Sequence, residues 1–331
     1  MRRESIACVI AFTILISLTP AAFGGSFTFS PIVVPGETLT VPFDINNAGQ
    51  IVGEYGCCAG SIGSHGFLLS GGTLTTIDFP GASGTSLTAV NDVGQIAGIY
   101  NAGGTNHGFL YSGGVFSTID FPGATLTQVF GINNTGQIAG EYVAGGQDRG
   151  FLYSGGVFST IDVPGAVATT ARGINDAGQI VGSYGLGTAH GFLLSSGLFT
   201  TIDVPGANAT DGFGINNSGD IVGRYQLVAG GDSHGFLLSG GTFATLDVAG
   251  FSNTLLDGIN DSGQIVGQSW NANQVVSDGI LISPVPAPVP EPSTLLLLGS
   301  GLAAMGGAAW RRSHRGPGRP RPSLGRSPAR E

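Results

Sequence analysis

The sequence predicts an all-β fold, a six-bladed β-propeller built from four-stranded units of about 42 residues. Three observations predict it: an internal repeat, the division of each repeat into four short strands, and an early strand that completes the last repeat. An open β-solenoid is the alternative architecture for the same repeats.

The repeat is clearest in a turn segment of the type I-N-x-x-G-Q-I-V-G. It occurs six times within residues 25–283, and successive copies are 41 to 45 residues apart. A period in this range is typical of propellers and solenoids. The first Asn of each turn is a candidate structural residue, at Asn46, Asn91, Asn133, Asn175, Asn216 and Asn260.

Each unit divides into four short apolar strands, which we expect in the second unit at 87–91, 95–100, 107–112 and 115–121. The first two strands are joined by N-[ND]-x-G, where Asn or Asp caps the backbone and Gly takes a positive φ. The third and fourth are joined by a Gly-Gly hairpin turn in most units. The first–second and third–fourth links therefore share one face of the ring. The longer, more variable links share the other face, where recognition is usually found.

The ends of the repeat region favour a closed ring over an open array. The sixth unit stops after its third strand, at 278–283, and has no fourth strand of its own. Residues 26–36, SFTFSPIVVPG, match the fourth-strand pattern F-S-T-I-D-F-P-G instead. An N-terminal strand that completes the sixth blade would seal the ring and hide its sheet edges.

Counting outward from the Gly-Gly turns places a basic residue opposite an acidic one in five blades. Each pair is thirteen residues apart in sequence. We interpret them as structural cross-strand pairs worth about 0.2–1 kcal/mol each, rather than as metal or ligand sites. The pairs are His65 with Asp78, His107 with Asp120, Arg149 with Asp162, His190 with Asp203, and His234 with Asp247.

Charge and motifs exclude several classes of function. Residues 25–290 contain three Arg, no Lys and eighteen Asp or Glu, a net charge near −15, which argues against nucleic-acid binding. No zinc-protease or P-loop motif occurs, and we expect neither catalysis nor a cofactor. Calcium is a minor alternative, because the Asn-rich turns lack the distal Glu of a calcium loop. Adjacent Cys57 and Cys58 are interpreted as a loop feature, since adjacent cysteines form only a strained disulfide.

Residues 1–24 read as a secretory signal peptide, with Arg2 and Arg3 before an apolar stretch and small residues at the cleavage point. At the other end, 284–294 is a Pro-rich linker that contains Pro290, Glu291 and Pro292. Residues 295–310 are apolar and predict a transmembrane sorting helix. Residues 311–331 form a basic tail that opens with Arg311, Arg312 and Arg315 and ends in a segment, 316–331, expected to be disordered.

This order of Pro-Glu-Pro, apolar helix and basic cluster resembles the PEP-CTERM sorting tail of Gram-negative bacteria. The resemblance implies processing by an exosortase-type enzyme, a transient stage in the inner membrane through 295–310, and then the cell surface or the exterior. It also implies an association with exopolysaccharide and biofilm. The extension at 316–331 departs from the pattern, because such tails usually end soon after the basic cluster.

The repeats themselves resemble the bacterial extracellular "HAF" family, with H-G-F-L-L or H-G-F-L-Y in place of H-A-F-L-W. That resemblance implies an extracellular location and no defined activity. We therefore expect a non-catalytic surface or matrix protein that mediates protein or polysaccharide interactions. One alternative is a propeller enzyme, a lyase or hydrolase acting on extracellular polysaccharide, and a unique polar cluster at the channel mouth would favour it. A further alternative is a spacer with no specific ligand.

Overall fold

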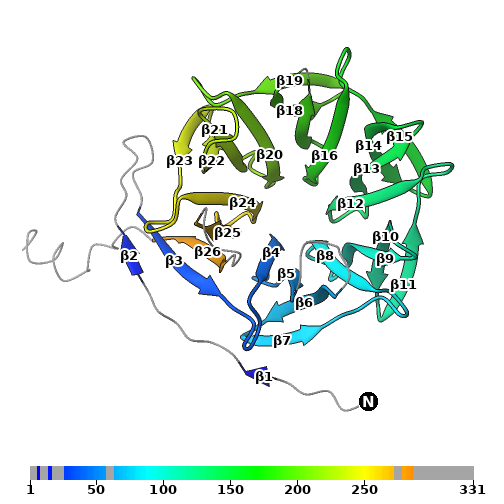
Figure 1. Cartoon of the computed structure of the whole chain (residues 1–331), viewed down its shortest axis with the longest axis horizontal. Helices are drawn as coiled ribbons and strands as arrows, with labels where there is room; N and C mark the ends of the chain where they lie inside the picture. Colours follow the sequence, from blue (N-terminus) through cyan, green and yellow to red (C-terminus); the bar gives the residue numbers. More distant parts are fainter. Residues whose placement is uncertain are drawn as a thin grey trace, which may run out of the picture. The chain divides into compact units, whose positions relative to one another are not determined.

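The computed structural model describes residues 6–7, 14–16, 26–56, 63–185, 187–271 and 278–285. Its strands form six antiparallel blades around a central axis, which confirms the predicted propeller (Figure 1). The described residues contain no helix. Most of the signal segment at 1–24, the Cys pair, the Pro-rich linker beyond residue 285, the sorting helix at 295–310 and the tail at 311–331 lie outside the described residues.

Each blade runs outward from the axis through four consecutive strands, with the last blade completed by an early one. Blade 1 contains β4 (Thr40–Ile45), β5 (Ile51–Tyr55), β6 (His65–Ser70) and β7 (Thr73–Thr76). Blade 2 contains β8 (Gly84–Val90), β9 (Ile96–Ala102), β10 (Thr105–Ser112) and β11 (Val115–Ile119). Blade 3 contains β12 (Leu126–Ile132), β13 (Ile138–Ala144), β14 (Gln147–Ser154) and β15 (Val157–Ile161). Blade 4 contains β16 (Ala168–Ile174), β17 (Ile180–Gly185), β18 (Ala189–Ser195) and β19 (Leu198–Ile202). Blade 5 contains β20 (Ala209–Ile215), β21 (Ile221–Gln226), β22 (Ser233–Ser239) and β23 (Thr242–Thr245). Blade 6 contains β24 (Asn253–Ile259), β25 (Ile265–Trp270), β26 (Asp278–Pro284) and β3 (Phe27–Ile32).

The N-terminal strand β3 closes the ring, as predicted from the missing strand of the sixth unit. It pairs antiparallel with β26, with Phe29 opposite Ile282. Phe27 and Phe29 are buried in one cluster with Ile280 and Ile282. Two further short strands, β1 (Ile6–Ala7) and β2 (Ile14–Ile16), pair with β7 and β3. The closure therefore joins the two ends of the repeat region through both backbone pairing and core packing.

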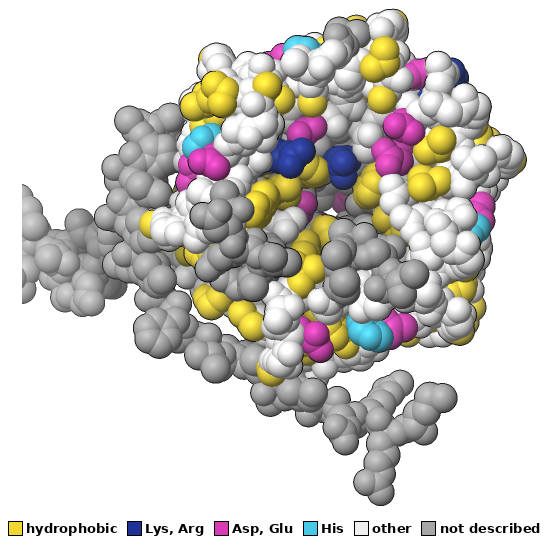
Figure 2. Space-filling model, in the orientation of Figure 1, with side chains coloured by type: hydrophobic (Ala, Val, Ile, Leu, Met, Phe, Trp, Pro, Cys, Tyr) yellow, Lys and Arg dark blue, Asp and Glu magenta, His cyan; other side chains and the backbone are white. Residues whose placement is uncertain are grey.

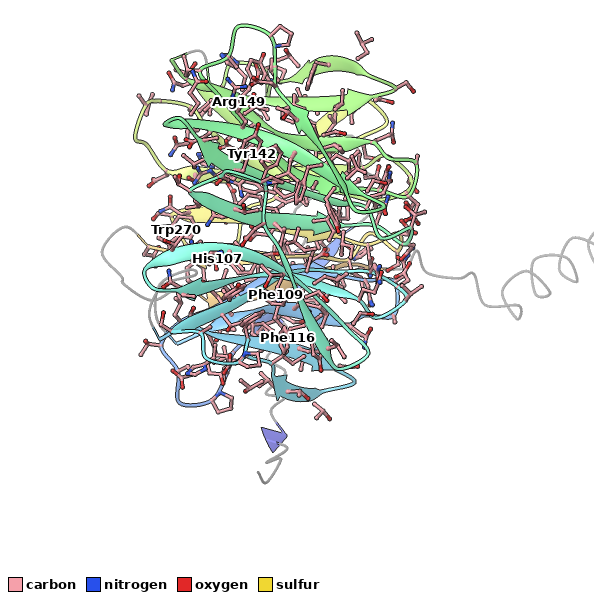
Figure 3. The ribbon with its side chains drawn as sticks, turned by 90° about the vertical axis from the view of Figure 1, so that its right-hand side faces the viewer. His107, Phe109, Phe116, Tyr142, Arg149 and Trp270 are labelled. Atoms are coloured by element: carbon pink, nitrogen blue, oxygen red, sulfur yellow. The ribbon has the colours of Figure 1, made fainter. Side chains whose placement is uncertain are left out.

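A Gly in the second strand and a Phe in the third strand form the packing unit of five blades. The Phe of H-G-F or R-G-F is at most 1% exposed in each of them, as for Phe109. Phe109 packs in one buried cluster with Val52 of the preceding blade, and Figure 3 labels its position in the side view. A Cβ placed on Gly98 would lie 2.4 Å from both the Phe109 ring and the Ser86 carbonyl oxygen. The motif Q-I-[VA]-G therefore ends in Gly because the inner strand and the Phe ring leave no space for a side chain.

Observed strand bounds in blade 2 differ slightly from the expected ones. The inner strand begins at Gly84 rather than at residue 87, and the outermost one ends at Ile119 rather than at 121. The inner strand is longer because its first residues already pair with β9. The outermost strand is shorter because the chain turns at Pro122-Gly123 into the next blade.

Candidate functional site in the central channel

A β-bulge in the innermost strand of every blade selects the residue that faces the channel. The pairing register shifts at the third residue before each turn Asn, for example between Val129 and Gly131. A bulge redirects the side chain at the extra residue. The six residues at this position are Phe43, Thr88, Phe130, Arg172, Phe213 and Asp257, and all of them line one cavity.

This central cavity has a volume of about 210 Å³ and is also lined by Ser86, Ile99 and Gln128. Those three residues lie on the half of β8, β9 and β12 that is remote from the N-[ND]-x-G turns. The cavity therefore opens on the face of the longer links, which we call the wide face. In Figure 2, basic and acidic side chains gather around the hollow at the centre of the ring. Below the bulge residues the channel narrows to a space of about 50 Å³.

Arg172 is the unusual group of the cavity. Its guanidinium carbon lies 4.8 Å from the centroid of Phe130 and 4.7 Å from that of Phe213, so two aromatic faces hold it in place. Among the described residues no carboxylate lies within ion-pair distance of it, and its Nε is buried without a hydrogen-bond partner. Burial lowers the pKa of Arg172, and the negative charges of Glu141 and Asp211 oppose that effect.

Two acidic side chains lie deep in the same channel. Burial raises the pKa of Asp257 well above its usual value, although the charge of Arg172 acts in the opposite direction. Burial also raises the pKa of Asp44 to about 7, against the opposing hydrogen bonds from the backbone N–H groups of Val90 and Ile45. Both carboxyl groups are therefore disposed to keep a proton at a pH where ordinary carboxyl groups have lost it.

The raised pKa of Asp44 predicts a specific pH dependence of stability. Between about pH 4 and pH 7 the folded protein binds more protons at Asp44 than the unfolded chain does, so stability falls as the pH rises. In Asp44→Asn this contribution is absent. Urea unfolding at pH 5 and pH 8 should show a smaller loss of stability in Asp44→Asn than in the unmodified chain. Equal losses in the two proteins would contradict the assignment.

The opposite end of the channel carries a closed ring of alternating amides and carboxylates. Each member is the second residue of an N-[ND]-x-G turn, and the backbone N–H of each donates to the side chain of the next. Each Asn also donates from Nδ2 to the Asp on either side, at 2.8–3.0 Å. This amide–carboxylate ring consists of Asn47, Asp92, Asn134, Asp176, Asn217 and Asp261. Strict alternation closes without two like residues in contact only when the number of blades is even.

The preceding turn Asn forms a second closed circle. Each of the six candidate turn residues is at most 4% exposed and donates from Nδ2 to the backbone carbonyl of its counterpart in the next blade, at 3.0–3.2 Å. Its Oδ1 accepts the N–H of the residue four positions later in all six turns, as Asn46 does from Gln50. These residues therefore both shape the hairpin and link neighbouring blades. Within the described ranges, no group of three His, Cys, Asp or Glu side chains could hold a metal ion.

Converting one amide of the amide–carboxylate ring to a carboxylate should destabilise the protein. Burial raises the pKa of Asp92, but hydrogen bonds from Asn134 and Asn47 outweigh that effect and lower it. Asn134→Asp removes one hydrogen bond to Asp92 and one to Asp176 and places three carboxylates in a row, so we expect a loss of about 1–3 kcal/mol at pH 7. Asn134→Ala serves as the control that removes the donors without adding charge. If Asn134→Asp is no less stable at pH 7 than Asn134→Ala, the ring contributes no electrostatic stabilisation.

The five outer pairs lie within contact distance. The four His Nδ1 atoms are 2.7–2.9 Å from their Asp Oδ2 partners, whereas Arg149 and Asp162 are 3.7 Å apart. Each His also packs on a Tyr of the neighbouring strand, as His107 does on Tyr100 at 5.1 Å between centroids. His107 and Arg149 lie toward the same side of the ring in Figure 3. Their repetition along the rim and their full use of local partners fit a structural role.

Sequence reasoning did not identify the channel residues. The signal was present, because the third position before each turn Asn varies in chemistry while its flanking positions repeat. A second signal is the alternation of Asn and Asp at the second position of successive turns. Both features become meaningful only when the six turns are placed around a common axis.

Comparison with known proteins supports the sorting tail and the fold. Residues 288–313 match the model of the PEP-CTERM protein-sorting motif. No curated protein matches the chain, and the resemblance of the repeats to the HAF family stays a prediction. No helix of the described residues is long and apolar enough to cross a membrane.

Solved propellers resemble the chain in fold only. A protein described as TolB from Agrobacterium tumefaciens aligns with a TM-score of 0.53 and 12% identity, over 76% of this chain and 91% of that one. Virginiamycin B lyase from Staphylococcus aureus, in a catalytically inactive form with quinupristin, aligns with a TM-score of 0.47 and 11% identity, over 77% of this chain and 99% of that one. A fucose-specific lectin from Aleuria aurantia aligns with a TM-score of 0.41 and 14% identity, over 78% of this chain and 100% of that one. The sorting motif marks the chain as an exported protein that an exosortase-type enzyme processes on its way to the cell surface.

Proposed function

We propose that the chain is a non-catalytic surface or matrix protein that binds polysaccharide or protein through the wide face of the propeller. The observation that carries this proposal is the central cavity, where Arg172 lies over two aromatic rings and has no ion-pair partner among the described residues. A buried charge without a partner is costly for folding, and such groups are common where a ligand completes the site. Export and surface sorting place this site where extracellular glycans and proteins are available.

The repeated architecture supports binding rather than chemistry. Away from the central cavity, polar groups recur from blade to blade and bond to one another, as the His–Asp pairs of four blades and the amide–carboxylate ring do. Catalysis usually depends on a unique set of groups. After processing near Pro290, Glu291 and Pro292, the propeller would remain attached to the surface or be released into exopolysaccharide or a biofilm matrix.

The second candidate is an enzyme that cleaves extracellular polysaccharide. The specific observation in its favour is the unique set of Arg172, Asp44 and Asp257 in the channel, with the pKa of both carboxyl groups raised. A carboxyl group with a raised pKa can act as a general acid near neutral pH.

A glycan array screened with the purified full chain, together with an assay for newly formed chain ends on every bound glycan, separates the two functions. We expect retention of at least one glycan class without release of fragments. Fragment release that Asp257→Asn abolishes would replace this proposal with the enzymatic one. Failure to retain any glycan would restrict the proposal to protein partners.

A further inference from the structure

The guanidinium of Arg172 is positioned to receive an acceptor from outside the chain. Side-chain hydrogen bonds from Arg172 to other described residues are absent, although its two aromatic neighbours fix its plane. A planar guanidinium offers paired donors whose spacing matches a carboxylate. Because the faces of the guanidinium are covered by Phe130 and Phe213, its N–H groups can bind a ligand only along the edge of the plane.

Two of the acidic groups whose charge acts on Arg172 are already engaged. Glu141 accepts a hydrogen bond from the Thr170 hydroxyl at 2.7 Å, and Asp211 accepts one from Arg224 at 3.0 Å. Arg224 therefore has an internal partner, whereas Arg172 has none within ion-pair distance among the described residues. The two arginines form a natural pair for comparison, because both lie over the Phe213 ring but only Arg224 has an ion-pair partner among the described residues.

The rest of the cavity suits one sugar ring. Phe43, Phe130 and Phe213 provide apolar faces, and Ser86 and Gln128 provide polar groups at the entrance. Asp257 Oδ2 is buried and has no partner among the described residues, and burial favours its protonated form, which donates a hydrogen bond. The volume of about 210 Å³ is below the roughly 300–1,000 Å³ of sites for drug-sized ligands, so a single ring fits better than a longer segment.

The channel also restricts which part of a glycan can enter. Below the bulge residues it narrows to about 50 Å³, and the amide–carboxylate ring lines its far end. A polymer therefore has no passage through the propeller. Only the end of a chain can place a sugar beside Arg172.

From these observations we propose that the central cavity binds one acidic sugar, a hexuronate at the end of a glycan chain, with its carboxylate paired to Arg172. This inference rests on the proposed function and adds to it the class of ligand and the group that recognises it. The carboxylate would accept two hydrogen bonds from the guanidinium, and the ring would lie among the three phenylalanines.

The test is calorimetric titration of the full chain with three matched trisaccharides. One ends in galacturonate, one ends in galactose, and one carries galacturonate only as its middle residue. We expect the acidic chain end to bind at least about 30-fold more tightly than the other two, because an unpaired buried charge is costly. Free galacturonate should compete with it, whereas free galactose should not.

Variants of the two arginines complete the test. Arg172→Gln should weaken binding of the acidic end by about 30-fold or more, and Arg224→Gln by less than about 3-fold. The thermal midpoint of Arg172→Gln should equal or exceed that of the unmodified chain, since the variant removes an unpaired buried charge. If Arg172→Gln fails to fold, the comparison of the three trisaccharides on the unmodified chain still tests whether the cavity binds an acidic sugar at a chain end.

Two negative outcomes have different meanings. Equal binding of galactose and galacturonate ends would overturn the acidic-sugar site and leave glycan binding intact. Retention of protein partners or other glycans on the wide face, with no binding of any trisaccharide, would likewise overturn only this site. Cleavage of the trisaccharides would instead overturn the proposed non-catalytic function.

Discussion

Phe29→Ala should lower the free energy of unfolding by about 3–5 kcal/mol, one of the largest effects of any single substitution in the chain. Phe29 is 6% exposed and packs in the core of blade 6, where its strand β3 pairs with β26. Its loss leaves a cavity at the joint where the N-terminal strand meets the last repeat. Urea denaturation followed by circular dichroism measures the change.

Thr28→Ala is the matched control for this joint. Thr28 lies on the same strand, is partly exposed, and donates only one long side-chain hydrogen bond, at 3.3 Å to the Ser283 carbonyl. We expect a change of less than about 1 kcal/mol for it. If Phe29→Ala were no more damaging than Thr28→Ala, β3 would not complete the sixth blade, and an open array would regain support.

Gly98→Ala should destabilise the protein by about 3 kcal/mol, at the upper end of the usual cost of overpacking. The new methyl group would meet the Ser86 carbonyl oxygen and the Phe109 ring, both at 2.4 Å. The carbonyl belongs to the inner strand and cannot move without disturbing the bulge that aims Thr88 into the channel. Thermal unfolding of the variant measures the cost.

Gly185→Ala is the comparison, because a Cβ at that position would lie 3.5 Å from Val167, an ordinary contact. We expect this variant to keep the thermal midpoint within a few degrees. Similar losses in the two variants would mean that the cost arises from strand glycines in general rather than from the close approach of the inner strand.

The fold was predictable because each level of the sequence pointed to the same architecture. The Asn-rich turns repeat at a propeller period, the Gly-Gly turns set the register of the outer hairpin, and the N-terminal strand supplies what the sixth unit lacks. The six turn Asn are buried and link neighbouring blades, which explains why they repeat so strictly.

The channel was not predictable in the same way. The alternating pattern of a strand does not indicate that the third residue before the turn forms a bulge. Arg172 and Asp257 point toward the axis only because they lie at such bulges. Their pairing depends on residues in other blades, about 40 positions away for Phe130 and Phe213. Burial, which sets the pKa of Asp44 and Asp257, is likewise a property of the assembled ring.

The two ends of the channel differ in character. The turn end is a saturated network in which each Asp of the amide–carboxylate ring has Asn partners on both sides. The wide end holds Arg172, whose fork has no internal partner among the described residues. This difference is the reason why we propose recognition at the wide end.

A crystal structure of the full chain soaked with a galacturonate-ended oligosaccharide would show what the central cavity binds. We expect one sugar ring in the central cavity, with its carboxylate within hydrogen-bond distance of Arg172 and the rest of the oligosaccharide leaving through the wide face. A cavity that holds only water while the oligosaccharide binds on the outer rim, or an Arg172 that pairs with Asp257 in place of the ligand, would contradict this expectation.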